Sequence, residues 1–210
     1  MGKRTASMLA LASVLVVGAQ VPAMAATTWK VVNPNADGSF AAVAPSLTVK
    51  NAAGRSLFDC TNFDVKGSLP SGSSPAGNFM ANVTMPTNCT GHDGGQGYVL
   101  VGTSMVPNHL AAQSFNASTG TTTFIHRSGG TVYSGGVFAA FAPGCSFFVT
   151  SIATTYTNAT STLKSTTAKA YPLNEGGSIS CAGLLTAGET ITFAAEYKVA
   201  PAIKITATTT

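Results

Sequence analysis

Apolar and polar residues alternate most regularly between positions 190 and 199, near the end of the chain. The residues of one face of this segment are all apolar: Ile191, Phe193, Ala195, Tyr197 and Val199. A period of two is what a strand with one buried face requires. The pattern therefore predicts a strand over 190–199 and, after the break at Pro201, a second short strand around Ile203 and Ile205.

Short apolar runs separated by Gly, Pro, Asn and Ser clusters predict strands along most of the remaining chain. Residues 113–115 and 121–125 flank a five-residue turn that ends at Gly120, as in a β-hairpin. Residues 108–115 have at most one or two turns of helical pattern. The other predicted strands are 28–32, 46–51, 56–65, 79–85, 98–104, 131–139 and 145–154. We therefore predict an all-β fold, a single antiparallel β-sandwich or barrel domain.

The N-terminus has the three parts of an export signal. Lys3 and Arg4 precede an apolar stretch over 8–17, and Ala23-Met24-Ala25 provides small residues for cleavage. This predicts a signal-peptide helix within residues 1–25 and a mature domain over 26–210. The apolar stretch is shorter than the ~20 residues of a membrane-spanning helix, so we expect no integral membrane segment in the mature chain.

Charged residues make up only 9% of the chain. Once the signal is removed, with Lys3 and Arg4, nine basic and seven acidic side chains remain, and the lysines are dispersed. A nucleic-acid surface needs a clustered basic stripe, so we expect no nucleic-acid partner. The surface must instead be rich in Thr, Ser, Asn and Gly.

The four cysteines fit export to an oxidising compartment. They include no CxxC pair, which disfavours a zinc ribbon or a thioredoxin-type redox site. Four cysteines allow three connectivities. Among these we predict the sequential one, Cys60 with Cys89 and Cys145 with Cys181.

The search for a nucleophile or a metal site finds little. Ser104 lies in Gly-Thr-Ser-Met-Val, which begins like a nucleophile elbow but lacks its closing glycine and the helix that must follow. His92, His109 and His126 are evenly and widely spaced, which is no metal-ligand motif. We predict no catalytic residue, no metal site and no cofactor.

The carboxylates offer no clear pair for acid–base chemistry. Asp59 and Asp64 are an odd number of positions apart, as are Glu189 and Glu196, so a regular strand would point each pair to opposite faces. The place where a hydrolytic site would most readily arise is His92 with Asp93, adjacent residues in a glycine-rich segment. A flexible turn is the alternative interpretation of that segment.

Several short motifs run through the mature chain: Trp29, Cys60, Asn88-Cys89-Thr90, Gly144-Cys145, Tyr156-Thr157-Asn158, Cys181-Ala182-Gly183-Leu184 and Tyr197-Lys198-Val199-Ala200-Pro201. With these motifs the chain resembles a loose group of secreted actinobacterial β-rich proteins that have four cysteines and no assigned activity. The resemblance implies an exported, disulfide-bonded β domain of bacterial origin and transfers no catalytic residue.

Two function classes follow. We expect a secreted, non-enzymatic extracellular or cell-envelope protein that acts through its surface. The sequence does not identify the partner, and the two candidates are a component of the cell envelope and an apolar small molecule. The alternative is a carrier of a lipid or another apolar small molecule, with Phe138, Phe141, Phe147 and Phe148 lining its cavity. A secreted hydrolase ranks last, because no motif joins the ionisable groups.

Overall fold

The structure is a computed structural model that describes residues 27–74, 78–83, 89–101, 108–128, 138–175, 178–179 and 181–209. All the regular secondary structure of these residues is β-strand. The predicted signal segment lies outside the described residues. The strands are β1 (Thr27–Val32), β2 (Ser39–Lys50), β3 (Ser56–Ser68), β4 (Gly72–Ser74), β5 (Asn78–Val83), β6 (Cys89–Gly91), β7 (Gln96–Val101), β8 (Asn108–Asn116), β9 (Thr121–Ser128), β10 (Phe138–Phe141), β11 (Phe147–Thr157), β12 (Thr162–Pro172), β13 (Asn174–Glu175), β14 (Ser178–Ile179), β15 (Glu189–Ala200) and β16 (Lys204–Thr209).

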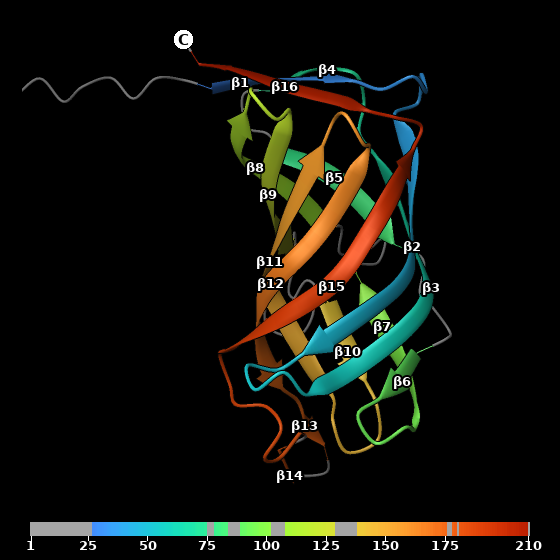
Figure 1. Ribbon diagram of the computed structural model, residues 1–210, viewed down its shortest axis with the longest axis vertical. Coiled ribbons are helices and arrows are strands. Elements are labelled where there is room, and N and C mark those ends of the chain that lie inside the picture. The colour runs from blue at the N-terminus through green and yellow to red at the C-terminus, as the bar shows by residue number, and fades with distance from the viewer. Residues whose placement is uncertain are drawn as a thin grey trace, which may run out of the picture.

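Five long strands form a continuous wall in the order β3-β2-β15-β12-β11, and each pairs antiparallel with its neighbour. Figure 1 shows β2, β15, β12 and β11 running side by side along the molecule. The two outer strands of this wall each have two further partners. Those additional pairings close the sheet on itself.

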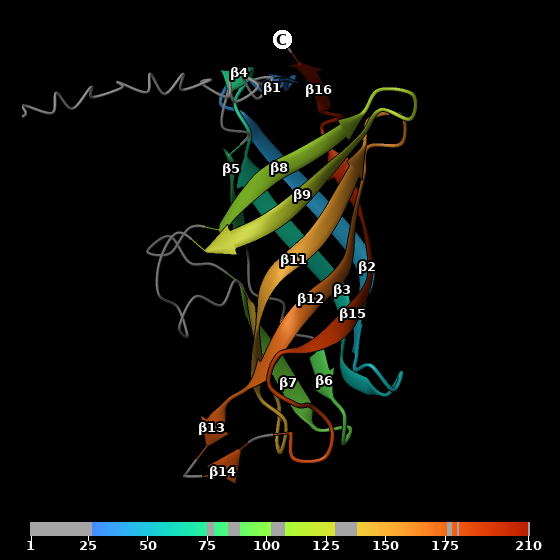
Figure 2. The same cartoon turned by 90° about the vertical axis from the view of Figure 1, so that its left-hand side faces the viewer.

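The closure occurs twice, once in each half of the molecule. In the upper half of Figure 1, residues 65–68 of β3 pair with β5 and residues 153–157 of β11 pair with β9. In the lower half, residues 58–60 of β3 pair with β6 and residues 147–149 of β11 pair with β10. The triplet β5-β8-β9 thus closes an upper ring of eight strands, and β6-β7-β10 closes a lower ring of eight (Figure 2). The predicted sandwich or barrel is therefore a closed antiparallel barrel with two stacked rings.

We call the level at which β3 and β11 change partner the waist. The wall strands are irregular there. Asn62 in β3 and Ser151 in β11 have positive φ angles of 53° and 54°, and the β2–β15 and β12–β15 ladders both shift register. Such bulges insert an extra residue and bend a strand. They let one wall curve into two rings.

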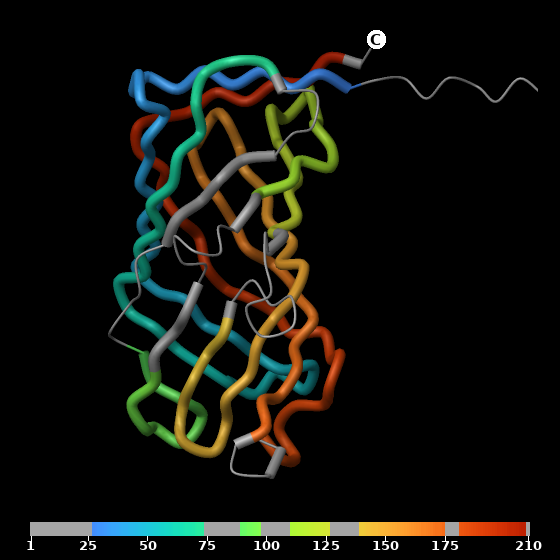
Figure 3. The backbone as a smooth tube through the Cα atoms, turned by 180° about the vertical axis from the view of Figure 1, so that it is seen from behind, coloured from blue at the N-terminus to red at the C-terminus, as the bar shows by residue number. Residues whose placement is uncertain are grey.

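A separate three-stranded sheet, β16-β1-β4, crosses the upper end of the barrel (Figure 1) and is called the cap. Its side chains Trp29, Val31 and Ile205 are buried, and so is Ile203, which directly precedes β16. Seen from behind, the blue and red cap strands lie at one end of the molecule, and the turn at 142–146 lies at the other (Figure 3).

The cap is tied to the barrel through the Tyr156-Thr157-Asn158 motif at the end of β11. The Tyr156 hydroxyl donates to the carbonyl oxygen of Ile203 at 2.6 Å. The Asn158 side-chain amide donates to the carbonyl of Ile205 at 2.7 Å and accepts from the Ile205 N–H at 2.9 Å. β16 is an edge strand, and these contacts occupy backbone groups that would otherwise be open to another strand.

Two disulfides join Cys60 to Cys89 and Cys145 to Cys181, which confirms the predicted connectivity. Cys60 and Cys89 are directly paired across β3 and β6, at the seam of the lower ring. Cys145 precedes β11, and its bridge to Cys181 fastens the segment that leads into β15.

The predicted strand over 190–199 is confirmed as β15. Residues 108–116 form strand β8, and the suggested helical turn over 108–115 is wrong. Hydrogen bonding to β5 and β9 holds this segment extended despite its weak pattern. Most of the predicted strand 131–139, and Ser104, lie outside the described residues.

The Asn158 contacts yield a testable prediction for the cap. Replacing Asn158 with Ala leaves the N–H and carbonyl of Ile205 without these partners, and we expect a loss of about 2–3 kcal/mol in the free energy of unfolding. Urea unfolding measures the change. Asn116→Ala is the matched control, because its side chain bonds only within the exposed turn at 116–120. Equal losses for the two variants would contradict the anchoring role.

Candidate functional site

A cavity of about 30 Å³ lies beneath the cap, and this is room for about one water molecule. Its lining is apolar apart from the Tyr156 hydroxyl, which is bonded to Ile203. The lining residues are Phe40, Leu69, Leu110, Phe124, Tyr156, Leu163, Val199, Ile203 and Ile205.

The four phenylalanines proposed to line a ligand cavity do not share one face. Phe147 is fully buried in the core. Phe148 and Phe141 are half-buried and are not part of the core cluster. The Phe138 side chain lies outside the described part of the chain. Phe147 and Phe148 are neighbours on β11 and face opposite sides of the sheet, so the four rings do not line one cavity together.

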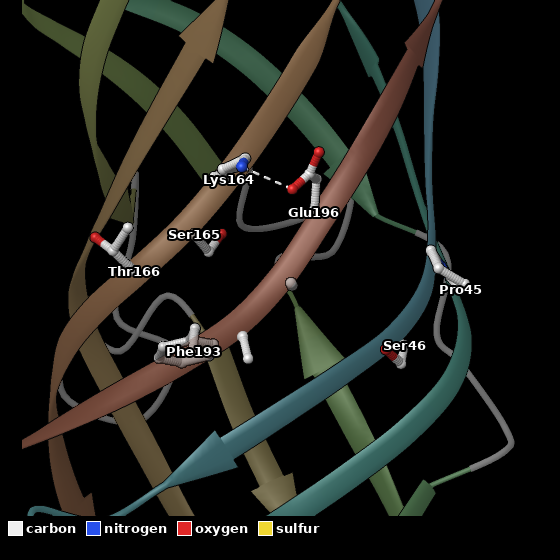
Figure 4. A pocket seen from close by; sticks show the side chains of 9 residues that line it. Pro45, Ser46, Lys164, Ser165, Thr166, Phe193 and Glu196 are labelled. Carbon is white, nitrogen blue, oxygen red and sulfur yellow. Dashed lines mark ion pairs between the residues drawn. The ribbon is translucent and has the colours of Figure 1, made fainter.

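An open groove of about 410 Å³ lies on the outside of the wall at the waist, where β2 and β15 shift register (Figure 4). Pro45 and Ser46 of β2 border it on one side, and Thr166 of β12 borders it on the other. Each of the two register shifts places an extra residue in one wall strand at this level. The sequence contained no recognised signal for this groove.

An ion pair stands beside the groove. Lys164 Nζ and Glu196 Oε2 are 2.7 Å apart, and both side chains are more than half exposed. Exposed pairs of this kind contribute only about 0–1 kcal/mol to stability. The pair therefore places two opposite charges at the edge of the groove and contributes little to the stability of the fold.

Below the groove, two aromatic rings stack on the outer surface of the same wall. Phe148 of β11 and Tyr171 of β12 are register partners, and their ring centroids are 5.1 Å apart with an interplanar angle of 14°. Both residues are half-buried. Sequence reasoning placed Phe148 in a cavity and overlooked Tyr171, because it assigned no strand to residues 162–172.

The structure does not bring the three histidines together. His92 is exposed in the turn between β6 and β7, whereas His126 faces into the upper ring from β9. The His109 side chain lies outside the described residues. Among the residues that are described, no three His, Cys, Asp or Glu side chains lie close enough to share a metal ion.

The His92–Asp93 segment is a tight turn. The Gly91 N–H donates to the carbonyl of Gly95, and Asp93 Oδ1 accepts from the Gly95 N–H at 2.9 Å. The carboxylate thus stabilises its own turn. These contacts fit the turn interpretation of the glycine-rich segment.

The prediction that Asp59 and Asp64 face opposite ways is wrong. Both side chains are exposed on the outer face of β3, because the alternation breaks at Thr61 and Asn62: these neighbours are both exposed, and Asn62 has a positive φ angle. Asp59 accepts hydrogen bonds from the hydroxyls of Thr48 and Ser56.

Glu189 has a structural role at the lower end of the barrel. Its carboxylate accepts hydrogen bonds from the backbone N–H groups of Thr186 and Ala52, and these bonds lower the pKa of its side chain. It thereby links the segment before β15 to the turn between β2 and β3.

In the part of the chain that the structure describes, no long apolar helix suited to crossing a bilayer is found. No match is found for the chain among models of known protein families, among curated proteins or among solved structures.

His126 is a strongly perturbed titratable group of the upper ring. The residue as a whole is half-buried, but Nε2 is shut off from solvent and has no hydrogen-bond partner among the described residues. Burial lowers its pKa from 6.5 to about 4. The fold therefore favours the neutral imidazole, whereas the unfolded chain takes up a proton near pH 6.5.

We expect stability to be greatest above pH 6.5 and to fall as the pH drops from 6.5 to about 4, because the unfolded state binds a proton that the folded state rejects. The loss is at most about 3 kcal/mol, and less if the partly exposed ring relaxes. Urea midpoints measured across this range for the parent, for His126→Gln and for the turn control His92→Gln test the prediction. Only His126→Gln should flatten the profile, and identical slopes for all three proteins would contradict it.

Proposed function

We propose that this protein is an exported, non-enzymatic bacterial protein of the cell exterior that acts by binding through its outer surface. The observation that carries the proposal is the contrast between inside and outside. The cavity described beneath the cap has room for about one water molecule, whereas the outer wall has an open groove of about 410 Å³.

Export is supported by the cysteines and by the N-terminal sequence. All four cysteines are paired in disulfides, which persist in oxidising compartments. Residues 1–25 have the sequence pattern of a cleavable signal. Together these features support a protein that folds outside the cytoplasm.

A binding role is supported by four described carboxylates whose oxygens are engaged in local contacts. Those of Asp59, Asp93 and Glu189 accept bonds from nearby hydroxyl or backbone groups, and that of Glu196 pairs with Lys164. General acid–base chemistry needs ionisable groups that converge on one point. A surface with rings, hydroxyls and an exposed ion pair suits recognition better.

Native mass spectrometry of the protein recovered from a bacterial culture that expresses the full chain tests this proposal. We expect the protein outside the cytoplasm, with the mass of residues 26–210 less four hydrogens and without a bound apolar molecule. Retention in the cytoplasm with residues 1–25 attached would contradict export. A stoichiometric lipid adduct would instead support the carrier alternative.

A further inference from the structure

We propose that the outer face of β12 and β15 is a binding track for an extended oligosaccharide chain. The proposal rests on the proposed function, in which the outer surface binds, and it names the chemical class of the ligand. The track begins at the stacked rings of Phe148 and Tyr171 in the lower half and ends at the groove at the waist.

The position of the track in the sheet limits what can bind. β12 lies between β11 and β15, and β15 lies between β12 and β2. Their backbone N–H and C=O groups are therefore largely used by neighbouring strands, and there is no free edge to which a peptide strand could add. A ligand on this face meets side chains only.

The aromatic end suits a sugar ring. Gly188 lies beside Tyr171, and a Cβ atom at position 188 would stand 3.8 Å from Cε1 of the tyrosine ring. Because residue 188 is a glycine, it places no side chain against this ring. Phe148 and Tyr171 are half-buried and are not packed into the core cluster. The C–H groups on one face of a sugar ring form an apolar surface that can pack against such rings, and the tyrosine hydroxyl adds a polar contact.

The middle of the track consists of hydroxyl and ammonium groups. Thr167 and Thr192 are register partners and both are exposed. Lys169 Nζ donates to Thr190 Oγ1 at 2.6 Å. Hydroxyls both donate and accept hydrogen bonds, which matches a ligand that carries hydroxyls along its length.

At its other end, the track runs into the groove at the waist, which is a hollow in the surface. Ala194 and Ala195 of β15 contribute small side chains to its lining, and the side chains of Ser46 and Thr166 stand at its sides (Figure 4). Residues 166–171 of β12 span roughly 17 Å at about 3.3 Å per residue. This length exceeds one sugar ring, so the track accommodates several consecutive units.

Other extended ligands fit less well. A nucleic acid needs clustered positive charge along its backbone, whereas Lys164 at the groove is already paired with Glu196. A lipid needs a continuous apolar surface, and the threonines and Lys169 interrupt it. An oligosaccharide satisfies both the rings and the hydroxyls.

Calorimetric titration of the mature protein with cellohexaose, chitohexaose, xylohexaose and hexagalacturonate tests the track. We expect at least one hexasaccharide to bind, and to bind more tightly than its own disaccharide, because it occupies more of the track. Tyr171→Ala should weaken that affinity about tenfold through the loss of ring packing. Tyr171→Phe, which keeps the ring, should retain most of it.

Thr192→Val, which removes one track hydroxyl, should weaken binding severalfold. Thr123→Val is its matched control, because Thr123 lies on the outside of β9 and away from the track. If no hexasaccharide binds at concentrations up to about 5 mM, or if Tyr171→Ala and Thr192→Val bind as the parent does, the assignment is wrong. Failure here leaves the mass-spectrometric result on export unchanged, so the two proposals can fail separately.

Discussion

Hydrogen bonding of β3 and of β11 to two different partners each is the constraint on which the rest of the structure depends. β3 bonds to β5 above the waist and to β6 below it, and β11 bonds to β9 above and to β10 below. Each switch requires the strand to be long enough for both rings and irregular in between. The positive φ angles of Asn62 and Ser151 lie at these two switches.

The two rings are closed at β3 in different ways. β3 pairs with β6 over only three residues, 58–60, and the Cys60–Cys89 bridge lies within that short ladder. A covalent link across a ladder this short holds the strands together where few backbone bonds do. The upper ring is closed instead by a four-residue β3–β5 ladder and covered by the cap, which Tyr156 and Asn158 fasten.

Closure also determines which surfaces of the barrel are open to solvent. A small barrel fills its interior with side chains, and the cap covers the upper opening. The long wall strands leave their outer faces free of covering elements in Figure 1. The bulges required by the two rings produce the groove on the same wall. The wall that is shared by the two rings therefore also carries the groove on its outer surface.

Sequence reasoning succeeded where the alternation was regular and failed where bulges interrupt it. β15 was predicted because its inward residues from Ile191 to Val199 are apolar at every second position. β12 was missed because its inward positions include Ser165, Ala168 and Ala170, and the shift after Ser165 changes the phase of the pattern.

The candidate surface was less predictable than the fold. Phe148 and Tyr171 meet only because β11 and β12 pair in a particular register, and no local pattern specifies that register. The groove depends on two register shifts between strands that are distant in sequence. The disulfide connectivity, by contrast, was predicted correctly as the sequential one.

The most direct test of the double closure is a set of nuclear Overhauser contacts between backbone protons of paired strands. In one folded protein, β3 should show contacts from Gly67 to Ala81 of β5 and from Asp59 to Thr90 of β6. β11 should likewise contact both β9 and β10. Contacts from β3 to only one of its two partners would contradict the two-ring barrel.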